Sequence, residues 1–138
     1  MENKVPPRHF IFVAIGGFFG AIARASLDVI GHGTTAMEIL PFSTAFANTL
    51  GALLLGFLTG FVAVSTPRWP LLEELRIMGG TGFLGAFTTY SSFALAFAGA
   101  PRWSLVAVEA TLYLTLGIVA ATIGIFSGKA LARAVHKQ

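Results

Sequence analysis

Four long stretches without a charged residue constrain what this chain can fold into. Residues 9–23, 39–67, 77–101 and 110–128 contain no Asp, Glu, Lys or Arg. About 20 apolar residues cross a bilayer as a helix, so four spans and short connections use up 138 residues. The sequence predicts an all-α membrane protein with one domain, residues 1–138, and four transmembrane helices. The predicted spans are about 9–30, 43–64, 75–98 and 103–126.

The charges that separate these stretches indicate the orientation of the chain. With 55% apolar and 11% charged residues, the composition is far from that of a water-soluble protein. The net charge is +3, and the basic residues lie mostly at segment ends, where they would meet lipid headgroups rather than nucleic acid. Four helices put both termini on one side of the membrane. If that side is cytoplasmic, two basic residues (Arg24 and Arg102) lie outside, against seven inside: Lys4, Arg8, Arg68, Arg76, Lys129, Arg133 and Lys137.

The first two spans carry small and polar residues that a purely lipid-facing helix does not need. Gly16 and Gly20 share one helix face and let a neighbouring backbone approach closely, as does a similar glycine pair in the second span. Arg24 faces either the membrane interface or a wet cavity. Asn48 needs hydrogen-bond partners within the membrane, so it is either a contact between helices or an amide donor facing an anion path.

The third span contains the most informative stretch of the chain. Residues 79–85 include four glycines, and a run of hydroxyl residues follows, so the helix is predicted to break near its middle. Such breaks expose backbone groups and commonly bind ions. Tyr90 and Phe93 share a helix face, with Ser91 and Ser92 between them. Aromatic ring edges are positive, so these rings and hydroxyls can hold a small anion.

Taken in order, these residues resemble the small bacterial fluoride channels known as Fluc, also called CrcB. The resemblance covers roughly residues 10–126 and rests on three motifs. They are Gly-x-x-x-Gly-Ala-x-x-Arg at 16–24, Thr-x-x-x-Asn-x-x-Gly at 44–51, and Gly-x-x-Thr-Thr-aromatic-Ser-x-Phe at 85–93. Each motif alone is weak, and the three together are specific.

The resemblance implies an antiparallel, dual-topology homodimer in the bacterial inner (plasma) membrane. Two pores at the subunit interface would conduct fluoride passively out of the cell. It also implies a central structural sodium ion held by main-chain carbonyls, which map onto Gly85 and Thr88. The implied pore residues are Asn48, the stacked aromatic rings of Tyr90 and Phe93, the hydroxyl track of Ser91, Ser92 and Thr44, and Arg24 near the pore entrance.

Three departures from the family pattern bear on the dimer. Tyr90 replaces the first of two phenylalanines and adds a hydroxyl. Ala96 stands where the family usually has a glutamate. The seven-to-two bias of basic residues exceeds what a dual-topology chain should show. Together they support an alternative in which this subunit has a fixed orientation and pairs with a homologous, inverted subunit.

Two other functional classes fit the sequence less well. A proton-coupled multidrug exporter of this size needs a carboxylate inside its first helix, and the first span offers only Asp28 near its end. A scaffold protein explains the packing glycines but not the buried Asn48. The three histidines lie in tails or the first loop, apart from any nucleophile and base arrangement, so the chain is not expected to be an enzyme.

Overall fold

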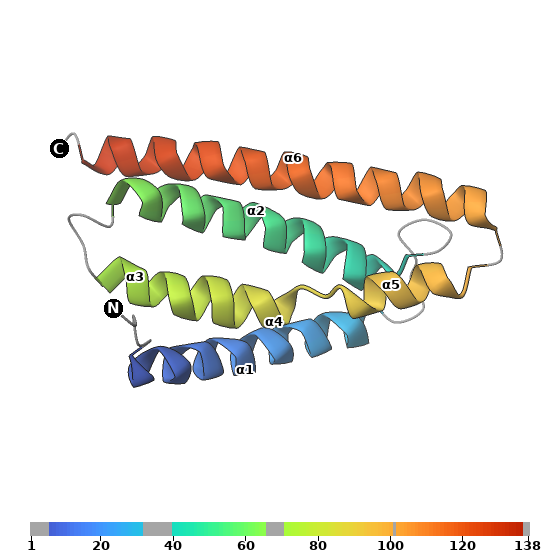
Figure 1. Ribbon diagram of the computed structural model, residues 1–138, viewed down its shortest axis with the longest axis horizontal. Helices are drawn as coiled ribbons and strands as arrows, with labels where there is room; N and C mark the ends of the chain where they lie inside the picture. Colours follow the sequence, from blue (N-terminus) through green and yellow to red (C-terminus); the bar gives the residue numbers. More distant parts are fainter. Residues whose placement is uncertain (1–5, 32–39, 66–70, 101, 137–138) are drawn as a thin grey trace, which may run out of the picture.

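The computed structural model describes residues 6–31, 40–65, 71–100 and 102–136. Its long helices are α1 (Pro7–Ile30), α2 (Phe42–Ser65) and α6 (Trp103–Val135), shown in Figure 1. Within the described residues, these three are long and apolar enough to cross a membrane. The prediction of an all-α protein with long apolar helices is confirmed.

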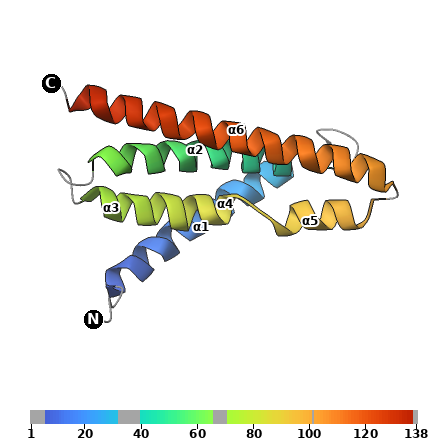
Figure 2. The same cartoon turned by 45° about the horizontal axis from the view of Figure 1, so that its top comes forward.

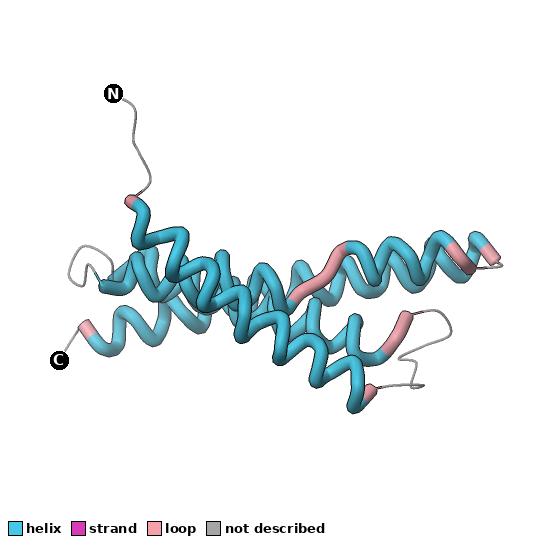
Figure 3. Tube along the Cα trace, turned by 90° about the horizontal axis from the view of Figure 1, so that it is seen from below, coloured by secondary structure: helices cyan, strands magenta, loops and turns pink. Residues whose placement is uncertain are grey.

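Between α2 and α6, the residues that the structure describes form four shorter elements. They are α3 (Leu71–Arg76), the π-helix η1 (Ile77–Leu84), α4 (Gly85–Phe87) and α5 (Ser91–Ala98). Helical geometry stops after Phe87 because Thr88 has an extended backbone, with φ −80° and ψ 157°. Figure 3 shows the loop that follows α4 in pink. The interruption places backbone groups beside α2 that a continuous helix would pair internally.

The helical elements associate mainly as two pairs. α2 packs along α6, and α1 packs along η1 and α4. Within each pair the elements run in the same direction, and both chain ends lie at one end of the molecule (Figure 1). α1 crosses the remaining helices obliquely (Figures 2 and 3). An ion pair of 3.3 Å between Arg8 Nε and Glu74 Oε1 joins the start of α1 to α3.

Glycines make the contact between α1 and η1. A Cβ placed on Gly16 would overlap backbone atoms of Met78 and Phe83, and one on Gly20 would overlap the Phe83 carbonyl. From the other side, a Cβ on Gly82 would meet Val13 and Gly16 backbone atoms. The absence of side chains at these positions therefore permits direct backbone contact.

A second set of glycines holds α2 against α6. Gly56 and Gly60 of α2 face the α6 backbone, while Gly124 and Gly128 of α6 face the α2 backbone around Phe57. Their spacing of four residues on both helices aligns all of them along one contact line. At the end of this pair, His136 Nε2 lies 3.1 Å from the buried Ser65 Oγ.

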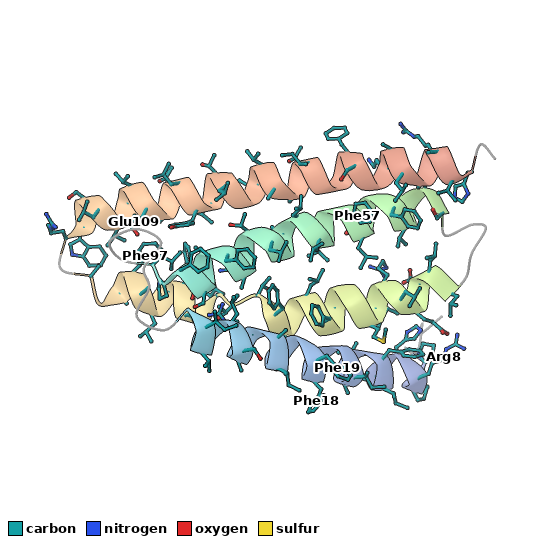
Figure 4. All side chains as sticks on the ribbon, turned by 180° about the vertical axis from the view of Figure 1, so that it is seen from behind. Arg8, Phe18, Phe19, Phe57, Phe97 and Glu109 are labelled. Carbon is teal, nitrogen blue, oxygen red and sulfur yellow. The ribbon has the colours of Figure 1, made fainter. Side chains whose placement is uncertain are left out.

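Large apolar side chains cover the outside of the molecule. Phe18 projects from α1 away from the other helices (Figure 4), and Phe18 and Phe19 are 63% and 56% exposed. In contrast, many of the buried positions hold Gly, Ala or Ser. This distribution suits a surface that meets lipid or another protein rather than water. α6 continues to Val135, past the predicted end of the fourth span at residue 126, and 33 residues make it about 50 Å long.

Candidate functional site

A groove of about 540 Å³ runs between α2, α6 and the interrupted segment from η1 to α5. Most of its lining is aliphatic or glycine, and polar atoms enter at few places. Of the predicted site residues, it brings together five: Asn48, Gly85, Thr88, Tyr90 and Phe93. A mostly apolar groove with a few convergent polar groups has the composition of a ligand site.

Asn48 pairs with the main-chain amide and carbonyl of Thr89, at the interruption between α4 and α5. Its Nδ2 donates to the Thr89 carbonyl at 2.9 Å, and its Oδ1 accepts from the Thr89 amide at 2.8 Å. Both ends of the side-chain amide are engaged, so α2 holds the interrupted backbone in place. One Nδ2 hydrogen has no part in this pair and can serve a further acceptor.

Hydrogen bonds at the interruption divert the amides that would pair with Gly85 and Thr88 in a continuous helix. The Gly85 carbonyl would accept from the Thr89 amide, which instead donates to Asn48. The Thr88 carbonyl would accept from the Ser92 amide, which instead donates to the Thr89 hydroxyl at 3.2 Å. Two main-chain carbonyls are therefore released from helical pairing at one point. Neutral carbonyl oxygens are the donor type that alkali cations bind in channel proteins.

The predicted aromatic and hydroxyl residues flank the interruption. Tyr90 is 82% exposed although it lines the groove, so its ring faces the molecular surface. Phe93 is half-buried and meets Phe97 edge to face, with ring centroids 4.7 Å apart. The hydroxyls of Ser91 and Ser92 each lie 3.3 Å from Thr89 Oγ1. These four residues directly follow Thr89, whose main chain the Asn48 amide binds.

Arg24 and Thr44 form a separate buried cluster at the α1–α2 contact. Arg24 Nη1 donates to the Ser43 carbonyl at 3.1 Å, and Nη2 donates to Thr44 Oγ1 at 2.9 Å. Nη2 also lies 3.0 Å from Asp28 Oδ1, one turn along α1. Arg24 and Thr44 are both buried, and neither is among the described residues that line the groove.

The Thr44 contact predicts a stability effect. We expect Thr44→Val to lower the free energy of unfolding by about 1–3 kcal/mol, because a buried guanidinium hydrogen loses its acceptor. Thr59→Val is the matched control, since Thr59 is on the same helix and exposed. Thermal unfolding in detergent measures both variants. Equal unfolding temperatures for the two would show that the Arg24 bond contributes nothing.

Two further residues in or near the site, Thr89 and Glu109, were not predicted as site residues. Thr89 joins Asn48 to both serines, although its position within a hydroxyl run gave no reason to prefer it. Glu109 is 2% exposed, and its Oε2 accepts from the Leu40 amide at 3.3 Å. Leu40 lies in a hydrophobic cluster with Phe97, against which Phe93 packs, and Figure 4 shows Glu109 and Phe97 at the same end of the molecule. A lone carboxylate in an apolar span was the available signal for Glu109.

Comparison with known proteins identifies the family to which this chain belongs. The family model described as CrcB-like protein, Camphor Resistance (CrcB), matches residues 11–129. The fluoride-specific ion channel FluC of Novosphingobium aromaticivorans is 38% identical over 90% of this chain and 95% of its own length. FluC 2 of Bacillus subtilis is 40% identical over 87% of each chain, and FluC 1 of Symbiobacterium thermophilum is 35% identical over 86% of this chain and 96% of its own length. The chain belongs to the CrcB-like family.

Proposed function

We propose that this chain is a fluoride-selective ion channel that passively exports fluoride from the cytoplasm. The observation that carries the proposal is the groove in which the Asn48 amide, the interrupted backbone and the Phe93 and Tyr90 rings come together. Its relatives carry the name of fluoride-specific ion channels, which supports a channel and not an enzyme. Long apolar helices in a chain of this family fit a multi-pass protein of the bacterial inner membrane.

The third membrane span in this proposal is the interrupted segment from Leu71 to Ala98. Its elements follow one another along the length of the molecule, between α1 and α2 (Figure 1). Backbone that leaves helical geometry at membrane depth is tolerated where protein or a water-filled path surrounds it. The Asn48 pair with Thr89 supplies that support from within the chain.

An antiparallel dimer completes the pore in this proposal. The groove in one chain is bordered by the exposed Tyr90 ring, so a single subunit supplies only part of a wall. A second, inverted copy covers the groove and repeats it, which gives two pores related by symmetry. The exposed apolar residues beside the groove on α6, Leu114 and Ile118, suit such a contact.

A structural sodium ion fits the interrupted backbone. The candidate ligands are the carbonyls of Gly85 and Thr88, because both lose their helical amide donors. Two carbonyls are too few for a cation site, so the proposal needs the same pair from the inverted subunit. When bound, the ion would supply positive charge at the interrupted backbone.

Fluoride selectivity comes from donors placed along a narrow path. The free Asn48 hydrogen and the hydroxyls of Ser91 and Ser92 replace water around the ion, and the edges of Tyr90 and Phe93 give weak positive potential. Arg24, although paired with Asp28, adds positive potential near the proposed pore entrance, and Thr44 orients its guanidinium. A larger anion with the same charge makes poorer contacts in such a path.

A second candidate is an obligate subunit of a heterodimeric fluoride channel. The bias of basic residues toward one side favours a fixed orientation, which would require an inverted partner of different sequence. The numbers in the names of two relatives, FluC 1 and FluC 2, indicate that paralogues occur in this family, and a heterodimer would be built from such paralogues. The Tyr90 hydroxyl, absent from the family pattern, supports the same assignment because two unlike subunits need not supply identical rings.

Fluoride release from liposomes tests the two candidates. We expect liposomes that contain only the purified chain to release fluoride rapidly, as followed with a fluoride electrode, and to retain chloride. Protein-free liposomes are the control. Release by the chain alone supports the homodimer. No release from a folded preparation, followed by release after co-reconstitution with a homologous subunit, would replace it with the heterodimer.

A further inference from the structure

Thr89 is the residue through which the other polar groups of the site are connected. Its amide and its carbonyl both bind the Asn48 side chain. Its hydroxyl oxygen accepts from the Ser92 amide at 3.2 Å and lies 3.3 Å from the hydroxyls of Ser91 and Ser92. One residue thus links α2 to the first turn of α5.

The hydroxyl geometry limits where protons can point. Thr89 Oγ1 donates its single hydrogen to Ser92 Oγ, so Thr89 can only accept from Ser91 Oγ. The Ser92 hydroxyl hydrogen must therefore point away from Thr89. The directions of the Ser91 and Ser92 hydrogens are therefore coupled through Thr89.

We propose that Thr89 is a positioning residue for the anion path, through which the Asn48 amide and the Ser91 and Ser92 hydroxyls are oriented. This inference rests on the proposed fluoride channel. Donors that are already oriented stabilise an anion without reorganisation when it arrives, whereas freely rotating hydroxyls must first be ordered. Loss of the Thr89 hydroxyl should thus slow fluoride release without removing any of the hydrogen-bond donors that contact the fluoride ion.

The first test compares two substitutions in the fluoride release assay. Thr89→Val keeps the shape of the side chain and removes the hydroxyl, and we expect fluoride release about five- to tenfold slower, the effect of one neutral hydrogen bond. Thr89→Ser keeps the hydroxyl, and we expect it to restore most of the rate. Unchanged release by Thr89→Val would overturn the proposal.

A second test separates positioning from simple capping of α5, since the Ser92 amide also depends on the Thr89 hydroxyl. Thr89→Val is combined with Ser91→Ala and with Ser92→Ala, one at a time. If Thr89 acts through a serine, Thr89→Val slows fluoride release by a clearly smaller factor in at least one of these serine variants than in the parent chain. The same fold-loss in both backgrounds and in the parent chain would assign Thr89 a structural role only.

A third measurement does not depend on transport. We expect Thr89→Val to speed hydrogen exchange at the Ser92 amide, and Asn48→Ala to speed exchange at the Thr89 amide. If the wild-type chain releases no fluoride, the proposed function fails while these exchange rates still test the network. Exchange unchanged by both substitutions would overturn the Thr89 proposal on its own.

Discussion

Asn48→Asp is expected to abolish fluoride release from liposomes while the purified protein stays folded. The substitution preserves shape but replaces Nδ2, the donor to the Thr89 carbonyl, with an oxygen that accepts only. It also places a negative charge on the proposed anion path. Like charges brought together cost several kcal/mol, and 1.4 kcal/mol corresponds to tenfold, so release should fall at least about a hundredfold.

The control for this substitution adds the same charge elsewhere. Ser104→Asp places a carboxylate in the first turn of α6, at an exposed position where a helix tolerates negative charge. We expect it to release fluoride at the wild-type rate. Gel filtration of both variants reports whether the fold and assembly persist. Full fluoride release by a folded Asn48→Asp protein would remove Asn48 from the conduction path.

The charge distribution and the apolar composition predicted long apolar helices, which the structure confirms. The uncharged stretches indicated spans at about 9–30 and 43–64, and the structure has helices at Pro7–Ile30 and Phe42–Ser65. The helix α6 continues to Val135, beyond the predicted span of about 103–126, which was placed just before the charge of Lys129. Long basic side chains extend along a helix toward water, so charge near the end of a span does not stop the helix.

The partners of individual polar side chains could not be predicted in the same way. Nothing local indicates that Arg24 binds Thr44, twenty residues later, because that contact depends on how α1 and α2 pack. Thr89 likewise stands in a run of four hydroxyl residues and a tyrosine, where only the folded backbone shows which hydroxyl is central. The glycine pair at Gly124 and Gly128, by contrast, carries the same four-residue spacing as Gly56 and Gly60 and was available in the sequence.

The glycines of α1 allow a matched test of how the helices are held together. Gly16 and Gly17 are neighbours on α1, yet a Cβ on Gly16 would overlap the Met78 carbonyl, whereas one on Gly17 would lie 3.9 Å from the Gly82 carbonyl. Replacing Gly by Ala in a helix otherwise favours folding by about 1 kcal/mol. The same substitution at the two sites should therefore have opposite effects.

We expect Gly16→Ala to lower the free energy of unfolding by about 1–3 kcal/mol, since α1 must move away from η1 and give up backbone contact. Gly17→Ala should leave it unchanged or raise it slightly. Thermal unfolding in detergent measures the difference, and the yield of folded protein gives an independent reading. Equal stability of the two variants would mean that the close approach of α1 to η1 does not hold the fold together. A large loss of unfolding free energy in Gly16→Ala alone would show that backbone contact at this glycine positions the interrupted segment beside α1. The apolar residues around it would then contribute less.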